Sequence, residues 1–200
     1  MVRRPSPPTA SLPPGAGAAS RRWWGHWPAV VGLVAAGIQV AGGVEPAAVS
    51  ITLAVAASCY LAAAALDRPW AAWAGIPAGS AVVVAGEVSG LPWWAGLSAY
   101  ALILLLIGVV RDHTARPLAE QCLALLVYGG AAVVAILVSP RGGLALAGSA
   151  LACHALWDLR HLRRGDVVPR SLAEFCIVLD IPLGAAAIAL ACTGAAAPTA

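Results

Sequence analysis

Long apolar runs, separated by short stretches of Arg, Asp, Pro and Gly, restrict the possible folds of this chain more than any other feature. A helix that crosses a membrane needs about 20 predominantly apolar residues, which matches the usual length of these runs. Because 60% of the residues are hydrophobic and only 10% are charged, the chain has too little polar surface for an ordinary soluble domain. The alternating pattern of β-barrel strands is not visible. The sequence therefore predicts an all-α helical bundle in a membrane.

The apolar runs predict seven transmembrane helices. The segments are residues 28–43, 47–66, 70–88, 93–110, 118–138, 144–162 and 171–192. We expect residues 1–22, which are rich in Pro, Ser, Ala and Arg, to form a disordered cytoplasmic tail. Residues 23–193 are then a single membrane domain, and residues 194–200 are a short C-terminal tail.

The basic residues predict the orientation of the bundle. All twelve are Arg, and eleven of them lie in the N-terminal tail or in the loops after the second, fourth and sixth segments. Arg141 is the exception. Since cytoplasmic loops of membrane proteins are enriched in positive charge, we expect a cytoplasmic N-terminus and an extracytoplasmic C-terminus in the plasma membrane. The absence of Lys excludes Schiff-base chemistry of the retinal-protein type, and a net charge of +3 is too small to indicate nucleic-acid binding.

A short sequence occurs twice. Residues 116–122 read RPLAEQC and residues 170–176 read RSLAEFC, each at the start of an apolar segment. One interpretation is a duplicated helical hairpin, which would relate residues 93–138 to residues 144–192. The other is convergent helix-start chemistry, since Arg and Glu four residues apart pair on one helix face.

Four ionisable residues inside the last two segments are not explained by topology. His154, Asp158 and His161 are spaced i, i+4 and i+7, so they form one stripe along a helix. If the last two helices form a hairpin turning near Val167, His154 and Asp180 lie at the same depth. A charged side chain at the bilayer centre costs about 2.5–3.5 kcal/mol on insertion scales, so this stripe should face the bundle interior. We therefore predict a buried polar cluster.

Such a cluster has three possible uses. Burial favours the neutral form of a carboxyl, so Asp180 or Asp158 could donate a proton while the two histidines relay it. The pattern His-x3-Asp-x2-His, with Asp180 as a fourth ligand, could instead bind a metal. The third use is a hydrogen-bonded structure that locks the two helices together. The leading interpretation is acid/base catalysis, without a metal or another cofactor.

Further residues are candidates for contacts with a substrate. Trp157 lies beside the stripe, and Tyr100 and Tyr128 could line a cavity, although packing explains tyrosines equally well. Glu87, near the end of the third segment, either marks the membrane interface or turns inward toward a substrate path.

These observations predict an intramembrane enzyme that acts on an isoprenoid or another lipid. The expected partners are membrane lipids and a hydrophobic small-molecule substrate. In general design the chain resembles small seven-pass integral-membrane terpene cyclases, and the resemblance implies chemistry by intramembrane acidic residues. It is a resemblance of architecture alone, so no residue roles are carried over. The alternative is a non-catalytic membrane protein, a small transporter or an accessory subunit, in which the polar cluster is structural.

Overall fold

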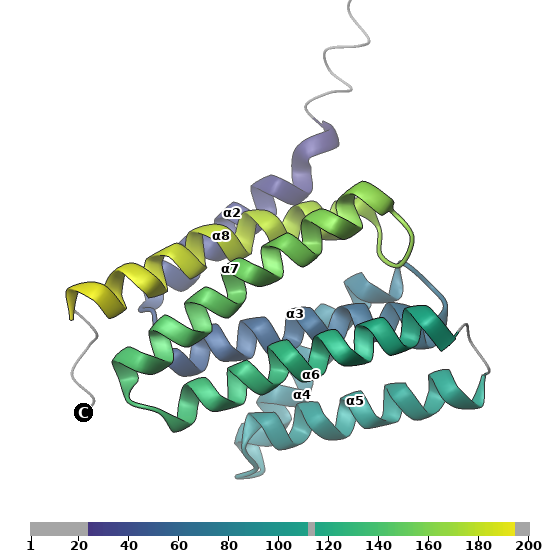
Figure 1. Ribbon diagram of the computed structural model, residues 1–200, viewed down its shortest axis with the longest axis horizontal. Helices are drawn as coiled ribbons and strands as arrows, with labels where there is room; N and C mark the ends of the chain where they lie inside the picture. The colour runs from purple at the N-terminus through teal and green to yellow at the C-terminus, as the bar shows by residue number, and fades with distance from the viewer. Residues whose placement is uncertain (1–23, 112–114, 195–200) are drawn as a thin grey trace, which may run out of the picture.

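The computed structural model describes residues 24–111 and 115–194, and this part of the chain is helical without strands (Figure 1). The expected N-terminal tail at 1–22 and residues 195–200 of the C-terminal tail lie outside the described residues. After a short 3-10 helix, η1 (Trp24–His26), come α2 (Trp27–Gly42), α3 (Pro46–Leu66), α4 (Ala71–Val88), α5 (Trp93–Val110), α6 (Ala115–Leu137), α7 (Pro140–Arg164) and α8 (Arg170–Thr193). Each of the seven expected segments corresponds to one α-helix, so the all-α prediction is confirmed.

Within the described residues, five helices are long and apolar enough to cross a membrane, namely α3, α4, α5, α6 and α8. Helix α2 is apolar but has only 16 residues. Helix α7 has 25 residues, which is long enough, but its Arg, Asp and His side chains make it much less apolar than its neighbours. The ionisable residues of α7 are therefore the feature of the bundle that most needs a structural explanation.

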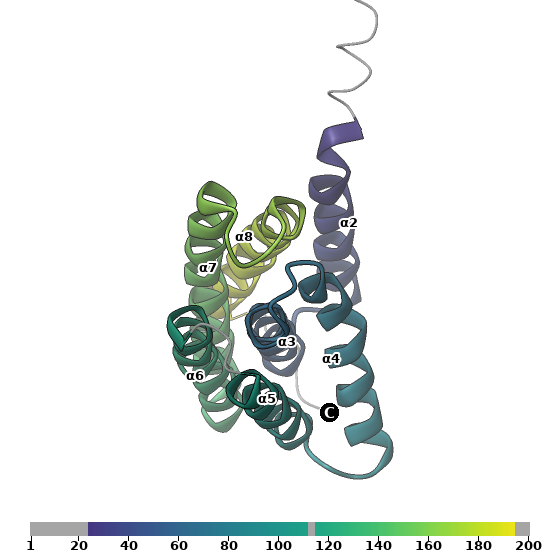
Figure 2. The same ribbon diagram turned by 90° about the vertical axis from the view of Figure 1, so that its right-hand side faces the viewer.

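Helix α3 is the central helix of the bundle. In the end-on view, α4, α5, α6 and α7 surround it (Figure 2). Its sequence is rich in Ala and Ser, and small side chains let helix backbones approach one another closely in a membrane. Residues 53–65 of α3 are all buried. A polar side chain in this stretch consequently has little access to solvent and needs a partner within the bundle.

The ends of the helices alternate between the two sides of the bundle. Trp27 at the start of α2 stacks on Trp73 in the first turn of α4, with 5.4 Å between ring centroids. Trp73 also lies 5.4 Å from the ring of Phe175 and donates a hydrogen bond to Ser171 Oγ at 3.1 Å. Both of these partners belong to the first two turns of α8. The starts of α2, α4 and α8 thus meet at one end of the bundle.

Helices α7 and α8 form a tightly packed antiparallel hairpin (Figure 1). Gly165, with φ of 65°, ends α7 in a left-handed conformation that suits a residue without a side chain. Within the hairpin, a Cβ atom on Gly148 would lie 2.8 Å from the carbonyl oxygen of Gly184, and the converse distance is also 2.8 Å. The two backbones are therefore in direct contact, which fixes the helix faces that carry His154 and Asp180.

Replacing Gly148 by Ala is expected to destabilise the protein. The added methyl would overlap the backbone of α8, and overpacking of this kind costs about 1–3 kcal/mol. Gly130→Ala is the matched control, because a Cβ at Gly130 meets no atom within 4 Å. The free energy of unfolding in mixed detergent micelles, measured by Trp fluorescence, should fall for Gly148→Ala and should not fall for Gly130→Ala. Equal stability of the two variants would contradict the close contact.

Candidate functional site

The inward faces of α3, α7 and α8 bring four polar side chains together. His154 Nδ1 lies 2.9 Å from Asp180 Oδ2 and 3.3 Å from Asp158 Oδ2. Tyr60 donates its hydroxyl hydrogen to Asp158 Oδ1 at 2.5 Å. All four residues are at most 1% exposed. We call Tyr60, His154, Asp158 and Asp180 the buried cluster; it contains the predicted contact between the equally deep His154 and Asp180.

The buried cluster leaves several polar atoms without a hydrogen-bond partner among the described residues. These atoms are His154 Nε2, Asp158 Oδ2 and Asp180 Oδ1. Polar groups buried away from water are normally satisfied, because an unmade hydrogen bond there costs about 1–3 kcal/mol. Three such atoms gathered around one imidazole make the buried cluster the candidate functional site among the described residues.

The charges of the buried cluster limit its protonation states. It holds two carboxyl groups and one imidazole, so ionising all three would leave a net charge of −1. Isolated charge is strongly disfavoured in an apolar interior. A neutral cluster requires either an imidazolium paired with one carboxylate and one protonated carboxyl, or a neutral imidazole with both carboxyls protonated. In both states at least one carboxyl group carries a proton inside the bundle.

His161 lies in a neighbouring network. Its Nδ1 lies 2.9 Å from the carbonyl oxygen of Trp157, and its Nε2 lies 3.3 Å from Gln121 Nε2. Gln121 Oε1 accepts a hydrogen bond from Trp157 Nε1 at 3.3 Å. These partners fit a neutral imidazole that donates from Nδ1 and accepts at Nε2. His161 reaches the buried cluster through Tyr60, whose ring lies edge-on with 4.8 Å between centroids. The expected four-residue cluster is thus two adjacent networks.

The second network, which consists of Gln121, Trp157 and His161, continues to the end of the bundle that carries most of the Arg residues. Arg160 lies over the ring of Trp157, with 4.5 Å from its guanidinium carbon to the ring centroid, and donates to Glu120 Oε2 at 2.7 Å. Glu120 also accepts from Arg116 Nε at 3.2 Å, which is the Arg–Glu pairing expected from the repeated sequence. In the second copy, Glu174 pairs instead with His26 Nδ1 at 2.8 Å. The relation between the two hairpins stays a prediction.

The candidate substrate contacts lie at different distances from the buried cluster. Tyr128 places its ring edge-on to His154, 4.9 Å between centroids, and donates to the carbonyl oxygen of Cys153 at 3.3 Å. Tyr100 is half-buried and packs against the hydrophobic core. Glu87 is exposed in the last turn of α4, at an end of the bundle, so the structure does not bring it to the buried cluster.

Sequence reasoning missed the roles of Tyr60 and Gln121. A signal for Tyr60 was present, because it is the single aromatic residue of an Ala-rich apolar helix, and a buried Tyr hydroxyl usually finds a partner. Gln121 is fully buried and connects Trp157 to His161. Its position directly after Glu120, at the start of an apolar segment, fits helix-start polarity equally well.

A metal ion would find donor atoms in the same place. His154, Asp158 and Asp180 each offer one ligand atom, and these atoms lie within 4.8 Å of one another. Structural zinc sites usually have four protein ligands, so a small cation would need a further donor here. The hydroxyl of Tyr60, which is hydrogen-bonded to Asp158, is the adjacent group.

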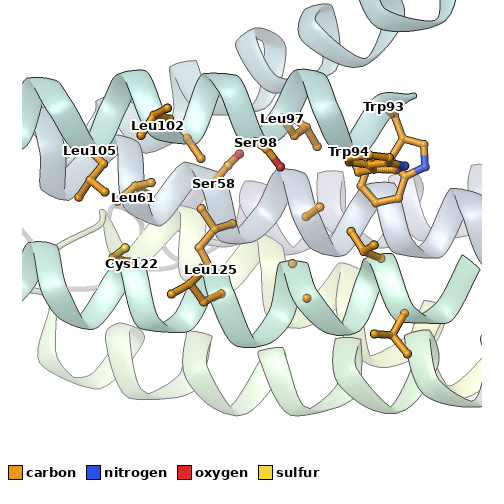
Figure 3. Close-up of a pocket in the computed structure, with 17 residues that line it drawn as sticks. Ser58, Leu61, Trp93, Trp94, Leu97, Ser98, Leu102, Leu105, Cys122 and Leu125 are labelled. Atoms are coloured by element: carbon orange, nitrogen blue, oxygen red, sulfur yellow. The ribbon is translucent and has the colours of Figure 1, made fainter. Parts of the chain in front are cut away.

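A cavity of about 550 Å³ lies between α3, α5 and α6 (Figure 3). Its walls are almost entirely apolar, and Trp93 and Trp94 line one end of it. None of the four residues of the buried cluster lines this cavity. Leu61 and Cys122, which do line it, are the sequence neighbours of Tyr60 and Gln121, so α3 and α6 separate the cavity from the polar side chains.

Comparisons of the chain with protein-family models, with curated proteins and with solved structures gave no match.

Proposed function

We propose that the protein is an intramembrane enzyme that transfers a proton to a lipophilic substrate, an isoprenoid or another lipid. The observation that carries the proposal is the buried cluster, in which two carboxyl groups share one imidazole and both acids retain an unpartnered oxygen. A neutral cluster holds at least one acidic proton inside an apolar bundle, where no bulk water accepts the proton from the carboxyl. General acid catalysis requires such a held and positioned proton.

The contacts suggest distinct roles for the two acids. Tyr60 donates a hydrogen bond to Asp158 Oδ1, and Asp158 Oδ2 lies at ion-pair distance from His154 Nδ1, so this carboxyl is best suited to be the carboxylate. Asp180 has one oxygen on His154 and a free Oδ1. We assign the donated proton to Asp180 Oδ1, with His154 returning a proton to it after each turnover. His161, whose imidazole can take up and release a proton, would connect the cluster with the Arg-rich end of the bundle.

The proton-transfer step balances as follows. The O–H bond of Asp180 breaks while a C–H bond forms on an alkene carbon of the substrate, which leaves a carbocation. Loss of a proton from a neighbouring carbon, after isomerisation or cyclisation, returns the proton to the cluster. No oxidant or reductant is required.

Deuterated water provides the test of this function. Membranes containing the protein are incubated in deuterated buffer with linear prenyl alcohols and hydrocarbons, and products are searched by mass spectrometry for deuterium bound to carbon. The proposal expects products with one deuterium that are absent from membranes without the protein. If no carbon-bound deuterium appears with these probes or with a total lipid extract, the proposed proton transfer is wrong.

We also infer that all seven α-helices span the plasma membrane, with the N-terminus cytoplasmic and the C-terminus extracytoplasmic. The Arg distribution supports this orientation, and the alternating helix ends support an odd number of spans. A reporter fused after Ala200 should be active outside the cytoplasm, whereas a reporter replacing residues 1–20 should be active inside it. Two reporters active on the same side would reject the seven-span arrangement.

One observation favours the non-catalytic alternative. The buried cluster is fully enclosed, and the large apolar cavity lies on the other side of α3 and α6. A purely structural cluster, in a small transporter or an accessory subunit, would need no access for a substrate. In that case replacement of Asp180 by Asn would change no activity of the protein.

A further inference from the structure

We propose that the cavity between α3, α5 and α6 is a binding site for a single-chain lipid that carries a hydroxyl group. Its volume of about 550 Å³ falls within the range of about 300–1,000 Å³ that is usual for small-molecule sites. This binding claim does not depend on whether the buried cluster is catalytic.

The cavity opens sideways, toward the surroundings of the bundle. Helices α5 and α6 hardly touch each other, and Figure 2 shows them as separate neighbours of α3. Leu102 on α5 and Leu126 on α6 both line the cavity and are 56% and 68% exposed. On α6, Gly129 and Gly130 contribute no side chains to the wall. A hydrocarbon chain could therefore enter from the bilayer between α5 and α6.

Two hydroxyl groups interrupt the apolar wall. Figure 3 shows the oxygens of Ser58 on α3 and Ser98 on α5 near the middle of the cavity. Ser58 is only 1% exposed and its Oγ donates to the carbonyl oxygen of Val55 at 2.7 Å, which leaves its lone pairs as acceptors at the cavity wall. Ser98 is exposed, so its hydroxyl is free to donate or accept.

The depth of these hydroxyls distinguishes the ligand from an ordinary bilayer lipid. At 1.5 Å per residue, Ser58 lies about 12 Å from the Leu66 end of α3 and about 18 Å from its Pro46 end. A phospholipid has its polar groups at the membrane surface and only methylene groups at this depth. A lipid alcohol whose chain fills the cavity can place its single hydroxyl against Ser58 and Ser98.

Photolabelling in phosphatidylcholine nanodiscs tests this site. The probe is a prenyl alcohol with a photoreactive diazirine in its chain, and labelled peptides are identified by mass spectrometry. We expect labelling within residues 93–105 and 122–134, and competition by the unlabelled alcohol. The hydrocarbon of the same skeleton without the hydroxyl should compete about three- to tenfold less well, which corresponds to the loss of one neutral hydrogen bond.

Two sets of variants make the result specific. Gly130→Leu should abolish the labelling, because its side chain enters the cavity and a Cβ there meets no atom within 4 Å. Gly37→Leu is the control: Gly37 is equally open but lies exposed on α2, away from the cavity. The double variant Ser58→Ala and Ser98→Ala should bind the alcohol no better than the hydrocarbon.

Two outcomes would overturn the proposal. These are labelling that Gly130→Leu leaves unchanged, and equal competition by alcohol and hydrocarbon on the unmodified protein. Because binding is measured without turnover, a failure of the proposed catalysis does not alter these results. A positive result likewise does not test the proposed proton transfer, which is tested by the experiment in deuterated water.

Discussion

Asp180→Asn is expected to abolish deuterium transfer to the substrate while the protein stays folded. The amide has nearly the size of the carboxyl and can still accept the hydrogen bond from His154 Nδ1, now 2.9 Å from Asp180 Oδ2. It cannot release a proton to a carbon centre near neutral pH, so the general acid is lost. The measurement is carbon-bound deuterium per mole of protein, with thermal unfolding in detergent on the same sample.

Glu174→Gln is the matched control for this variant. Glu174 is an acid on the same helix, and the substitution is the same change from carboxyl to amide, but its partner is the exposed His26. We expect Glu174→Gln to retain full deuterium transfer. Metal content of both proteins is measured at the same time, because loss of a bound ion only from Asp180→Asn would assign the effect to a metal site. Full transfer by Asp180→Asn would leave Asp158 as the remaining candidate acid.

His154→Leu is expected to be the most destabilising single substitution in the buried cluster. The imidazole contacts both carboxyls, at 2.9 and 3.3 Å. Removing one partner of a buried ionic contact usually costs about 3–5 kcal/mol, because the remaining polar groups lose their compensation. The double variant His154→Leu and Asp180→Leu should recover much of this loss, since apolar replacement of a buried pair is often neutral.

His26→Ala provides the comparison on the surface. His26 pairs with Glu174 at 2.8 Å, almost the same distance as in the buried pair, but its side chain is 72% exposed. Exposed ion pairs contribute about 0–1 kcal/mol, so this variant should unfold nearly as the unmodified protein does. The measurement is the free energy of unfolding of both variants in mixed micelles. A His154→Leu variant as stable as His26→Ala would show that the imidazole does not compensate the two acids.

The sequence allowed the helices and part of the site to be predicted because both depend on local patterns. Apolar runs of sufficient length define the helices, and the i, i+4, i+7 spacing places His154, Asp158 and His161 on one face of α7. The contact with Asp180 also followed from the sequence, since the short loop from Gly165 to Pro169 makes α7 and α8 antiparallel neighbours. Residues equally far from that turn then lie at equal depth.

Contacts between distant helices did not follow from the sequence. Tyr60 reaches Asp158 across 98 positions of the chain, and Gln121 reaches His161 across 40. Which helix lies beside α7 depends on how the whole bundle packs. In an apolar sequence, a helix face exposed to lipid and a face buried against another helix have the same apolar composition. Glu87 illustrates the same limit, because its position in the last turn of α4 fits both an interface residue and an inward-facing one.

The sequence by itself determined the class of fold, the number of α-helices and the presence of ionisable groups within the bundle, because hydrophobicity and helical period are properties of consecutive residues. The tertiary structure alone decided the division into two networks and the position of the cavity. The division arises because α3 places Tyr60 between His154 and His161. The cavity arises because Gly129 and Gly130 fill no space between α5 and α6, and such an unfilled volume exists only once the helices are packed.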